Sequence, residues 1–176
     1  ASAPRAPLPG IVRGAVWAFG IAGFVNMCLQ LGWTRALVLA IGNSTYAFSL
    51  ILGTFIFGLA LGGAIGGLFA DRIQNPVRFF GALLVATALS AAATIPWLGI
   101  GPAHFAVRLA DLGAHLGDFS YGRFLGAAFS SEVLVILPAT ILMGMALPVV
   151  GRLRVQSVDA VGDAVGAAYA ANTVGA

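Results

Sequence analysis

The sequence predicts an all-α, polytopic helical membrane protein with four transmembrane helices, the start of a fifth and one interfacial amphipathic helix. Of its 176 residues, 60% are hydrophobic and only 9% are charged, whereas about a quarter of the residues in ordinary soluble domains are charged. So few charges cannot cover the surface of a soluble fold, and lipid must solvate much of the chain. The charges are also spaced so that long apolar windows separate them.

The charge-free windows set the expected spans, because a helix needs about 20 mainly apolar residues to cross a ~30 Å hydrocarbon core. The cluster of Pro96, Gly99, Gly101 and Pro102 is expected to end the third span. Residues 1–10 contain three prolines and are expected to form a flexible tail. Residues 11–176 are then a single membrane domain. The predicted spans cover about 14–34, 46–70, 79–98 and 124–150, and a fifth helix over about 161–176 is cut off at Ala176.

An amphipathic helix is predicted over about 103–119. Its apolar residues are spaced four, three, four and three apart, which places them on one helical stripe. They are Phe105, Leu109, Leu112, Leu116 and Phe119. Such a helix is expected to lie along the membrane surface. Asp111, His115 and Asp118 share its polar face. A solvated stripe is favoured over a metal site there, because no second ligand-bearing segment is evident.

The arginines predict the orientation of the chain. Six of the nine fall on the side of the N-terminus, and cytoplasmic loops carry the excess of basic residues. The sequence therefore predicts a bacterial cytoplasmic (inner) membrane protein with a cytoplasmic N-terminus and a periplasmic loop at 99–123. The aromatic residues agree with this orientation if they lie at the outer membrane boundary. They are Trp33, Tyr46, Trp97 and Tyr121.

The second predicted span carries a ridge of glycines. Gly58, Gly62 and Gly66 recur every four residues, and Gly63 and Gly67 form an adjacent pair. A ridge without side chains lets another helix approach backbone to backbone, and van der Waals contact then drives helix association in lipid. The pattern predicts close helix packing. It leaves open whether the partner helix belongs to this chain or to another.

A small set of polar residues lies within or beside the predicted spans. Glu132 is the one acid inside a span, and an intramembrane carboxylate is costly unless it is paired or protonated. Asn26 and Gln30 share one face of the first span, and Arg35 follows them. A cluster of these four side chains could bind a cation or relay protons, or it could be a structural hydrogen-bond network between helices. The structural alternative is favoured.

Several functional classes are excluded by what the sequence lacks. The basic residues are all arginines and do not cluster, so nucleic-acid binding is not expected. Cys28 is the only cysteine, so no internal disulfide and no thiolate metal site can form. No catalytic set of side chains and no phosphate-binding loop is present. The sequence predicts no enzyme, no metal and no cofactor, and leaves open a bound lipid or pigment.

Two blocks of sequence resemble the membrane region of the bacterial membrane-bound spermidine-synthase-like proteins. The first is residues 23–72, with WTR, YAFS and GLALG, and the second is residues 137–176, with LPATILMGMALP and GAAYAANTVGA. The first block also resembles the second-span exit of the major facilitator superfamily, where Gly67, Asp71 and Arg72 match a Gly-x-x-x-Asp-Arg signature on the cytoplasmic side. The resemblance implies that an aminopropyltransferase-like domain follows such a region. No catalytic residue carries over.

Three functions are consistent with these features. The favoured one is a non-catalytic accessory subunit that packs against other integral membrane proteins and lipid, in a larger hetero-oligomeric complex of a photosynthetic or respiratory kind. The second is part of a facilitator-like transporter for a small cation or polyamine, with its site near Glu132. The third is the membrane anchor of a spermidine-synthase-like enzyme. The subunit is favoured because catalytic groups are missing and intramembrane polar groups are few.

Overall fold

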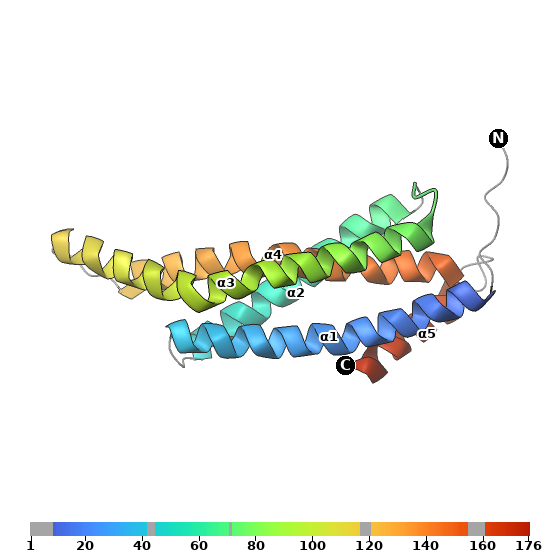
Figure 1. Cartoon of the computed structure of the whole chain (residues 1–176), viewed down its shortest axis with the longest axis horizontal. Coiled ribbons are helices and arrows are strands. Elements are labelled where there is room, and N and C mark those ends of the chain that lie inside the picture. Colours follow the sequence, from blue (N-terminus) through green and yellow to red (C-terminus); the bar gives the residue numbers. More distant parts are fainter. Residues whose placement is uncertain (1–8, 42–44, 71, 117–120, 155–160) are drawn as a thin grey trace.

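The chain folds into long helices that lie side by side (Figure 1). The computed structural model describes residues 9–41, 45–70, 72–116, 121–154 and 161–176. Within these ranges it contains five α-helices and no strand, which confirms the all-α prediction. The helices are α1 (Pro9–Ile41), α2 (Thr45–Ala70), α3 (Pro76–Leu116), α4 (Tyr121–Arg154) and α5 (Val161–Gly175).

Four of these helices are long and apolar enough to cross a membrane, as the sequence predicts. Their apolar spans are Arg13–Ala36, Phe48–Ala70, Pro76–Pro96 and Val135–Leu153. The second differs by only two residues at one end from the predicted 46–70. Large apolar side chains on the outer faces of the bundle are exposed, as expected where lipid replaces water as the solvent.

Helix α4 is the central helix of the bundle. Successive helices from α1 to α4 run in opposite directions, and α5 returns beside α1 (Figure 1). Helix α4 contacts each of the other four helices. Half of its span is buried, against 22–28% for the spans in α1, α2 and α3. The apolar core is therefore organised around α4, and the other helices keep most of their surface on the outside.

Two apolar clusters fill the core, one toward each end of the bundle. The first lies where α1 and α3 begin, and the second lies further along both helices. The first cluster consists of Ala15, Phe19, Phe80, Leu83, Ala146, Val149, Val150, Leu153 and Ala168. The second consists of Trp33, Ile51, Phe55, Ala91, Ile136, Ala139 and Met143. Both clusters contain residues of α1, α3 and α4, so these three helices are held together at two levels.

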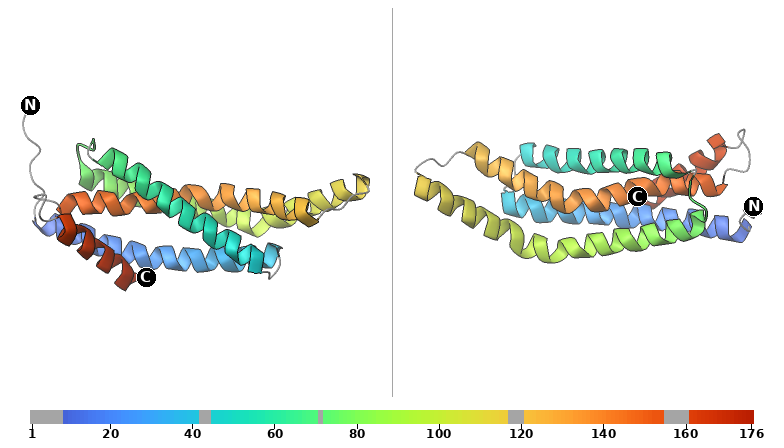
Figure 2. Two further views of the ribbon diagram at one scale, coloured as in Figure 1. Left: turned by 180° about the vertical axis from the view of Figure 1, so that it is seen from behind. Right: turned by 90° about the horizontal axis from the view of Figure 1, so that it is seen from above.

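The predicted break after the third span is wrong. Helix α3 continues through Pro96 and Pro102 to Leu116 and is 41 residues long. Each proline removes one backbone donor, but a helix that stopped there would free several backbone groups, which is the worse alternative in or near lipid. The helix bends part-way along instead (Figure 2). The residues expected to form a separate interfacial helix over about 103–119 are a continuation of α3 as far as Leu116, and 117–119 lie outside the described residues.

The predicted loop at 99–123 lies outside the apolar spans, but its described residues are helical, since α3 continues to Leu116 and α4 begins at Tyr121. The end of α3 and the start of α4 project together beyond the ends of α1 and α2 (Figures 1 and 2). From Pro96 to Leu116 the helical rise amounts to about 30 Å. Val107 and Asp111 are exposed on this projection. The chain therefore extends a helical hairpin past the bundle, where the sequence analysis placed a loop and a surface helix.

The start of α1 also differs from the prediction. The helix begins at Pro9, which is a favourable first helical residue because its missing amide would be unpaired there in any case. Pro9 and Gly10 are thus helical and do not belong to the predicted tail. Residues 1–8 lie outside the described part of the chain. The fifth helix, expected over about 161–176, is confirmed as α5.

Candidate functional site

The structure places three of the predicted ridge glycines against α4. A Cβ atom added at Gly62 would overlap the carbonyl oxygen of Ile141 and lie 2.8 Å from its carbonyl carbon. At Gly58 it would overlap the hydroxyl of Thr140, and at Gly66 it would lie 2.8 Å from the Pro148 ring. All three glycines are buried. The helix that packs on the ridge is therefore α4 of the same chain.

The other two predicted glycines contribute little to this interface between α2 and α4. A Cβ at Gly63 would meet only the carbonyl oxygen of Gly144, at 3.8 Å, and Gly67 is exposed with nothing within 4 Å. Gly144 itself completes the interface from α4, because a Cβ there would overlap the Leu59 carbonyl oxygen. Gly144 was not among the predicted packing residues, although it lies within the quoted block LPATILMGMALP.

A second glycine contact joins α1 to α5. A Cβ at Gly20 would lie 3.0 Å from the carbonyl oxygen of Ala171, and one at Gly23 would meet Asn172. Both glycines are buried. Gly175 of α5 also belongs to this contact, because a Cβ there would overlap the carbonyl oxygen of Gly20. The contact was not predicted, since two glycines three residues apart on α1 are a weaker signal than the ridge on α2.

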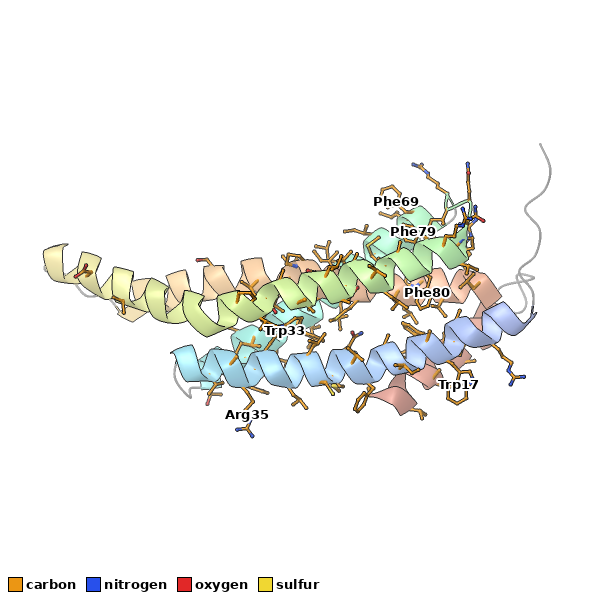
Figure 3. All side chains as sticks on the ribbon, in the orientation of Figure 1. Trp17, Trp33, Arg35, Phe69, Phe79 and Phe80 are labelled. Atoms are coloured by element: carbon orange, nitrogen blue, oxygen red, sulfur yellow. The ribbon has the colours of Figure 1, made fainter. Side chains whose placement is uncertain are left out.

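The described residues of the predicted polar cluster do not gather in one place. Asn26 and Gln30 are half-buried on α1, whereas Arg35 is exposed and points away from the bundle (Figure 3). Glu132 belongs to α4, but its side chain lies outside the described part. Arg35 thus does not contribute to a buried site on α1.

The predicted facilitator-like motif lies at the turn between α2 and α3. Gly67 and Arg72 are both exposed, and the Arg72 backbone amide donates to the carbonyl oxygen of Phe69 at 3.0 Å. Asp71 lies outside the described residues. The motif thus lies at a helix–helix turn, and both the resemblance and the role of its acid stay predictions.

Trp33 lies three residues from the end of the α1 span at Ala36, which leaves its predicted place at the membrane boundary a prediction, but its side chain faces the bundle and not the lipid. The side chain is 3% exposed, and its Nε1–H donates to the hydroxyl of Thr94 at 2.9 Å. Its ring packs against Phe55 with the centroids 6.5 Å apart. The indole finds its polar partner inside the bundle and needs no headgroup region. The side chains of Tyr46, Trp97 and Tyr121 lie outside the described part.

Trp33 belongs to a regular series of contacts between α1 and α3, here called the α1–α3 seam. The two helices run in the same direction (Figure 1). Phe19 meets Phe80 edge-on, with the ring centroids 6.4 Å apart, and Trp33 meets Thr94. Each pair is separated by 61 positions in the sequence, and Asn26 and Thr87, which have the same separation, lie midway between them. Contacts seven residues apart are typical of helices packed nearly parallel.

The middle of the α1–α3 seam is open. A groove of about 310 Å³ lies between the two pairs, and Asn26 and Thr87 both line it. The remaining lining residues are apolar: Ala18, Ile21, Ala22, Val25 and Leu29 from α1, and Leu84 and Ala88 from α3. The Thr87 hydroxyl donates to the carbonyl oxygen of Leu83 at 2.8 Å. Asn26 was predicted as a candidate polar residue, whereas Thr87 and the groove were not predicted.

Elsewhere, the buried polar side chains of the described residues are bonded within their own helices. Thr54, Thr94 and Thr140 are at most 7% exposed, and each hydroxyl donates to a carbonyl oxygen three or four residues earlier. One buried nitrogen of the described side chains, Nη1 of Arg152 near the end of α4, has no hydrogen-bond partner. The described core is therefore largely apolar.

A comparison with protein-family models, with curated proteins and with solved structures finds no match to this chain. The resemblance to the membrane region of spermidine-synthase-like proteins thus stays a prediction from the quoted motifs.

Proposed function

We propose that the chain is a non-catalytic integral membrane subunit of a larger hetero-oligomeric complex. This proposal rests on how the polar side chains of the core are hydrogen-bonded. In the described part of the bundle, the buried threonines Thr54, Thr94 and Thr140 satisfy their hydroxyls within their own helices. A transport path or a catalytic centre requires several polar groups that face a shared space, whereas the groove of the α1–α3 seam is lined by only two polar side chains, Asn26 and Thr87. A core of this kind supports a role in assembly.

The outer faces supply the surface for such an assembly. The spans of α1, α2 and α3 are only 22–28% buried. Aromatic side chains lie on these faces: Trp17 is 71% exposed, Phe24 58% and Phe57 60%. Large aromatic residues contribute much of the contact area where protein surfaces meet. The proposal assigns the outward face of α1 to partner helices and lipid.

Extraction from native membranes in a mild detergent tests the proposal. We expect the chain to migrate with other integral membrane proteins at fixed stoichiometry, as measured by native electrophoresis and mass spectrometry. Migration of the protein by itself would contradict a subunit role. A mass well above the 17.9 kDa of this sequence in the same experiment would instead support the anchor of a larger enzyme.

A point substitution makes the same test specific to the outward face of α1. Trp17→Ala is expected to reduce the fraction that co-migrates by about tenfold, because an aromatic residue at the centre of an interface commonly contributes more than 1 kcal/mol. Its side chain points away from the bundle (Figure 3), so the circular dichroism spectrum should not change. The matched control is Leu89→Ala on α3, where the side chain is 66% exposed. Equal loss in both variants would contradict a role for the α1 face.

We further propose that the chain lies in a bacterial cytoplasmic membrane with its N-terminus in the cytoplasm. Figure 1 places the start of α1, the turn between α2 and α3 and the end of α4 at one end of the bundle. Arg13, Arg72 and Arg78 are exposed at this end, and basic residues favour the cytoplasmic side. The projecting hairpin of α3 and α4 is then periplasmic.

Cysteine labelling of spheroplasts checks this orientation. In a Cys28→Ser background, Asp111→Cys is expected to react with a membrane-impermeant maleimide in intact spheroplasts, because Asp111 is exposed on the projecting hairpin. Gln74→Cys is expected to react only after lysis, since this exposed residue lies at the opposite end. The reverse labelling pattern would invert the proposed orientation.

A further inference from the structure

The open middle of the α1–α3 seam leaves a polar group without a partner in the membrane. Asn26 is half-buried and lines the groove, and within the described part of the chain no hydrogen bond to its carboxamide is recorded. The residue lies 13 positions from Arg13 and 10 from Ala36, the two ends of the α1 span. It is thus about 20 Å and about 15 Å from those ends, close to the middle of the bilayer.

At this depth, neither water nor hydrocarbon supplies a hydrogen-bond partner for the Asn26 carboxamide. Water is scarce in the hydrocarbon region, so a polar group there must be paired within the protein or with a ligand. Thr87 faces the same groove, and its hydroxyl oxygen is able to accept a hydrogen bond, but no hydrogen bond joins it to Asn26, and the hydroxyl donates to the carbonyl oxygen of Leu83. The two N–H donors of the Asn26 carboxamide therefore call for an acceptor from outside the described chain.

The dimensions of the groove indicate the shape of that ligand. The groove extends along α1 from Ala18 to Leu29, a helical rise of about 16 Å. With a volume of about 310 Å³ over that length, the groove is elongated and suits an extended hydrocarbon chain better than an α-helix, whose diameter is about 10 Å.

We propose that the groove of the α1–α3 seam binds a membrane lipid with a single hydrocarbon chain and a carbonyl oxygen, and that Asn26 donates a hydrogen bond to this oxygen. The ester carbonyls of phospholipids lie near the headgroups, whereas Asn26 lies near the middle of the span. The favoured ligand is therefore one whose carbonyl enters the hydrocarbon core, such as a quinone with an alkyl or isoprenoid tail. This binding site is independent of the proposed subunit function.

The groove lies between two contacts that fix the positions of α1 and α3 relative to each other. Phe19 and Phe80 hold the helices at one side of it, and the hydrogen bond from Trp33 to Thr94 holds them at the other. Between them, the small side chains of Ala18, Ala22 and Ala88 line the space. The site is thus preformed, and the ligand does not have to separate the helices in order to bind.

Native mass spectrometry of the full chain in phosphatidylcholine nanodiscs tests the site. The probes are decylubiquinone, which has ring carbonyls, and decylbenzene, which has none. The wild-type protein is expected to bind one decylubiquinone and to bind decylbenzene about tenfold more weakly. Asn26→Leu keeps the size of the side chain and is expected to remove this difference. An unchanged preference for decylubiquinone in that variant would overturn the role of Asn26.

A matched pair of alanine substitutions tests the location. Ala88→Phe is expected to fill the groove and weaken decylubiquinone binding at least tenfold. Ala92→Phe places the same ring one turn along α3, where Ala92 is exposed and does not line the groove, and it should bind as the wild type does. Equal binding by the two variants would overturn the site. Circular dichroism verifies that each variant is folded.

The lipids that the protein retains during purification distinguish the sources of the carbonyl. Organic extraction of wild-type protein is expected to yield a quinone-type lipid that the Ala88→Phe protein lacks. If a phospholipid alone is lost in that variant, the groove holds an ordinary acyl chain and the proposed carbonyl at the level of Asn26 is wrong.

Discussion

The substitution Gly62→Ala is expected to lower the free energy of unfolding by about 2–3 kcal/mol, because it overpacks a tight interface. The added Cβ would overlap the Ile141 carbonyl oxygen and come within 3.0 Å of the Gly144 Cα. Both neighbours are backbone atoms of α4, so no side chain can rotate to make room. Since α4 contacts all the other helices, moving it away from α2 disturbs the whole bundle. Titration of the protein in mixed micelles with sodium dodecyl sulfate, followed by circular dichroism, measures the loss.

The matched control for this prediction is Gly67→Ala on the same helix. Nothing lies within 4 Å of a Cβ at Gly67, and alanine favours a helix over glycine by about 0.5–1 kcal/mol. The free energy of unfolding should therefore stay the same or rise. Gly144→Ala approaches the interface from the other side and should resemble Gly62→Ala, because its Cβ would overlap the Leu59 carbonyl oxygen. Equal stability of Gly62→Ala and Gly67→Ala would show that the α2–α4 contact is looser than described.

The sequence predicted the helices well because lipid imposes a length and a composition on each span. The second span, expected over 46–70, is the helix Thr45–Ala70. The prediction for α3 was wrong because Pro96 and Pro102 were given the effect they have in water, where freed backbone groups are solvated. Pro96 lies at the end of the apolar span, where a broken helix would leave backbone groups unpaired in lipid, and α3 continues through it.

The inward and outward faces of the helices could not be predicted in the same way. In a soluble protein, polarity separates the core from the surface, but here both the core and the lipid-facing surface are apolar. Trp17 and Trp33 illustrate the difficulty, since one is 71% exposed and the other 3% although both lie on α1. Glycine spacing did carry information, because it marks where backbones approach. It could not name α4 as the partner of α2, which requires the tertiary structure.

The same limit applies to the candidate site. The sequence marks Asn26 as a polar residue in a span, and the expected partners were the other polar residues, Gln30, Arg35 and Glu132. Arg35 is exposed instead, and the neighbour of Asn26 across the α1–α3 seam is Thr87. The two residues are 61 positions apart, as are Phe19 and Phe80 and also Trp33 and Thr94. A single sequence does not reveal that residues of α1 and α3 with this separation are neighbours.

Truncation of Trp33 is expected to destabilise the bundle more than Gly62→Ala does. Trp33→Ala removes a side chain that is 3% exposed and packs against Phe55, and such deletions lower the free energy of unfolding by about 3–5 kcal/mol. It also removes the contact that holds α1 to α3 beside the open groove. Trp17→Ala is the matched control on the same helix. Because Trp17 is 71% exposed, its loss should change the stability of the isolated protein by less than 1 kcal/mol.

A double-mutant cycle separates the hydrogen bond of Trp33 from its packing. Thr94→Val removes the acceptor and leaves the indole N–H buried without a partner, which costs about 1–3 kcal/mol. Trp33→Phe removes the donor, while the Thr94 hydroxyl still donates to the carbonyl oxygen of Ala91 at 2.7 Å. Combined, the two substitutions should cost less than the sum of the single effects, by about 1 kcal/mol. Strict additivity would mean that packing alone holds α1 to α3 at this level, and the preformed groove would then depend on ring contacts at both of its ends.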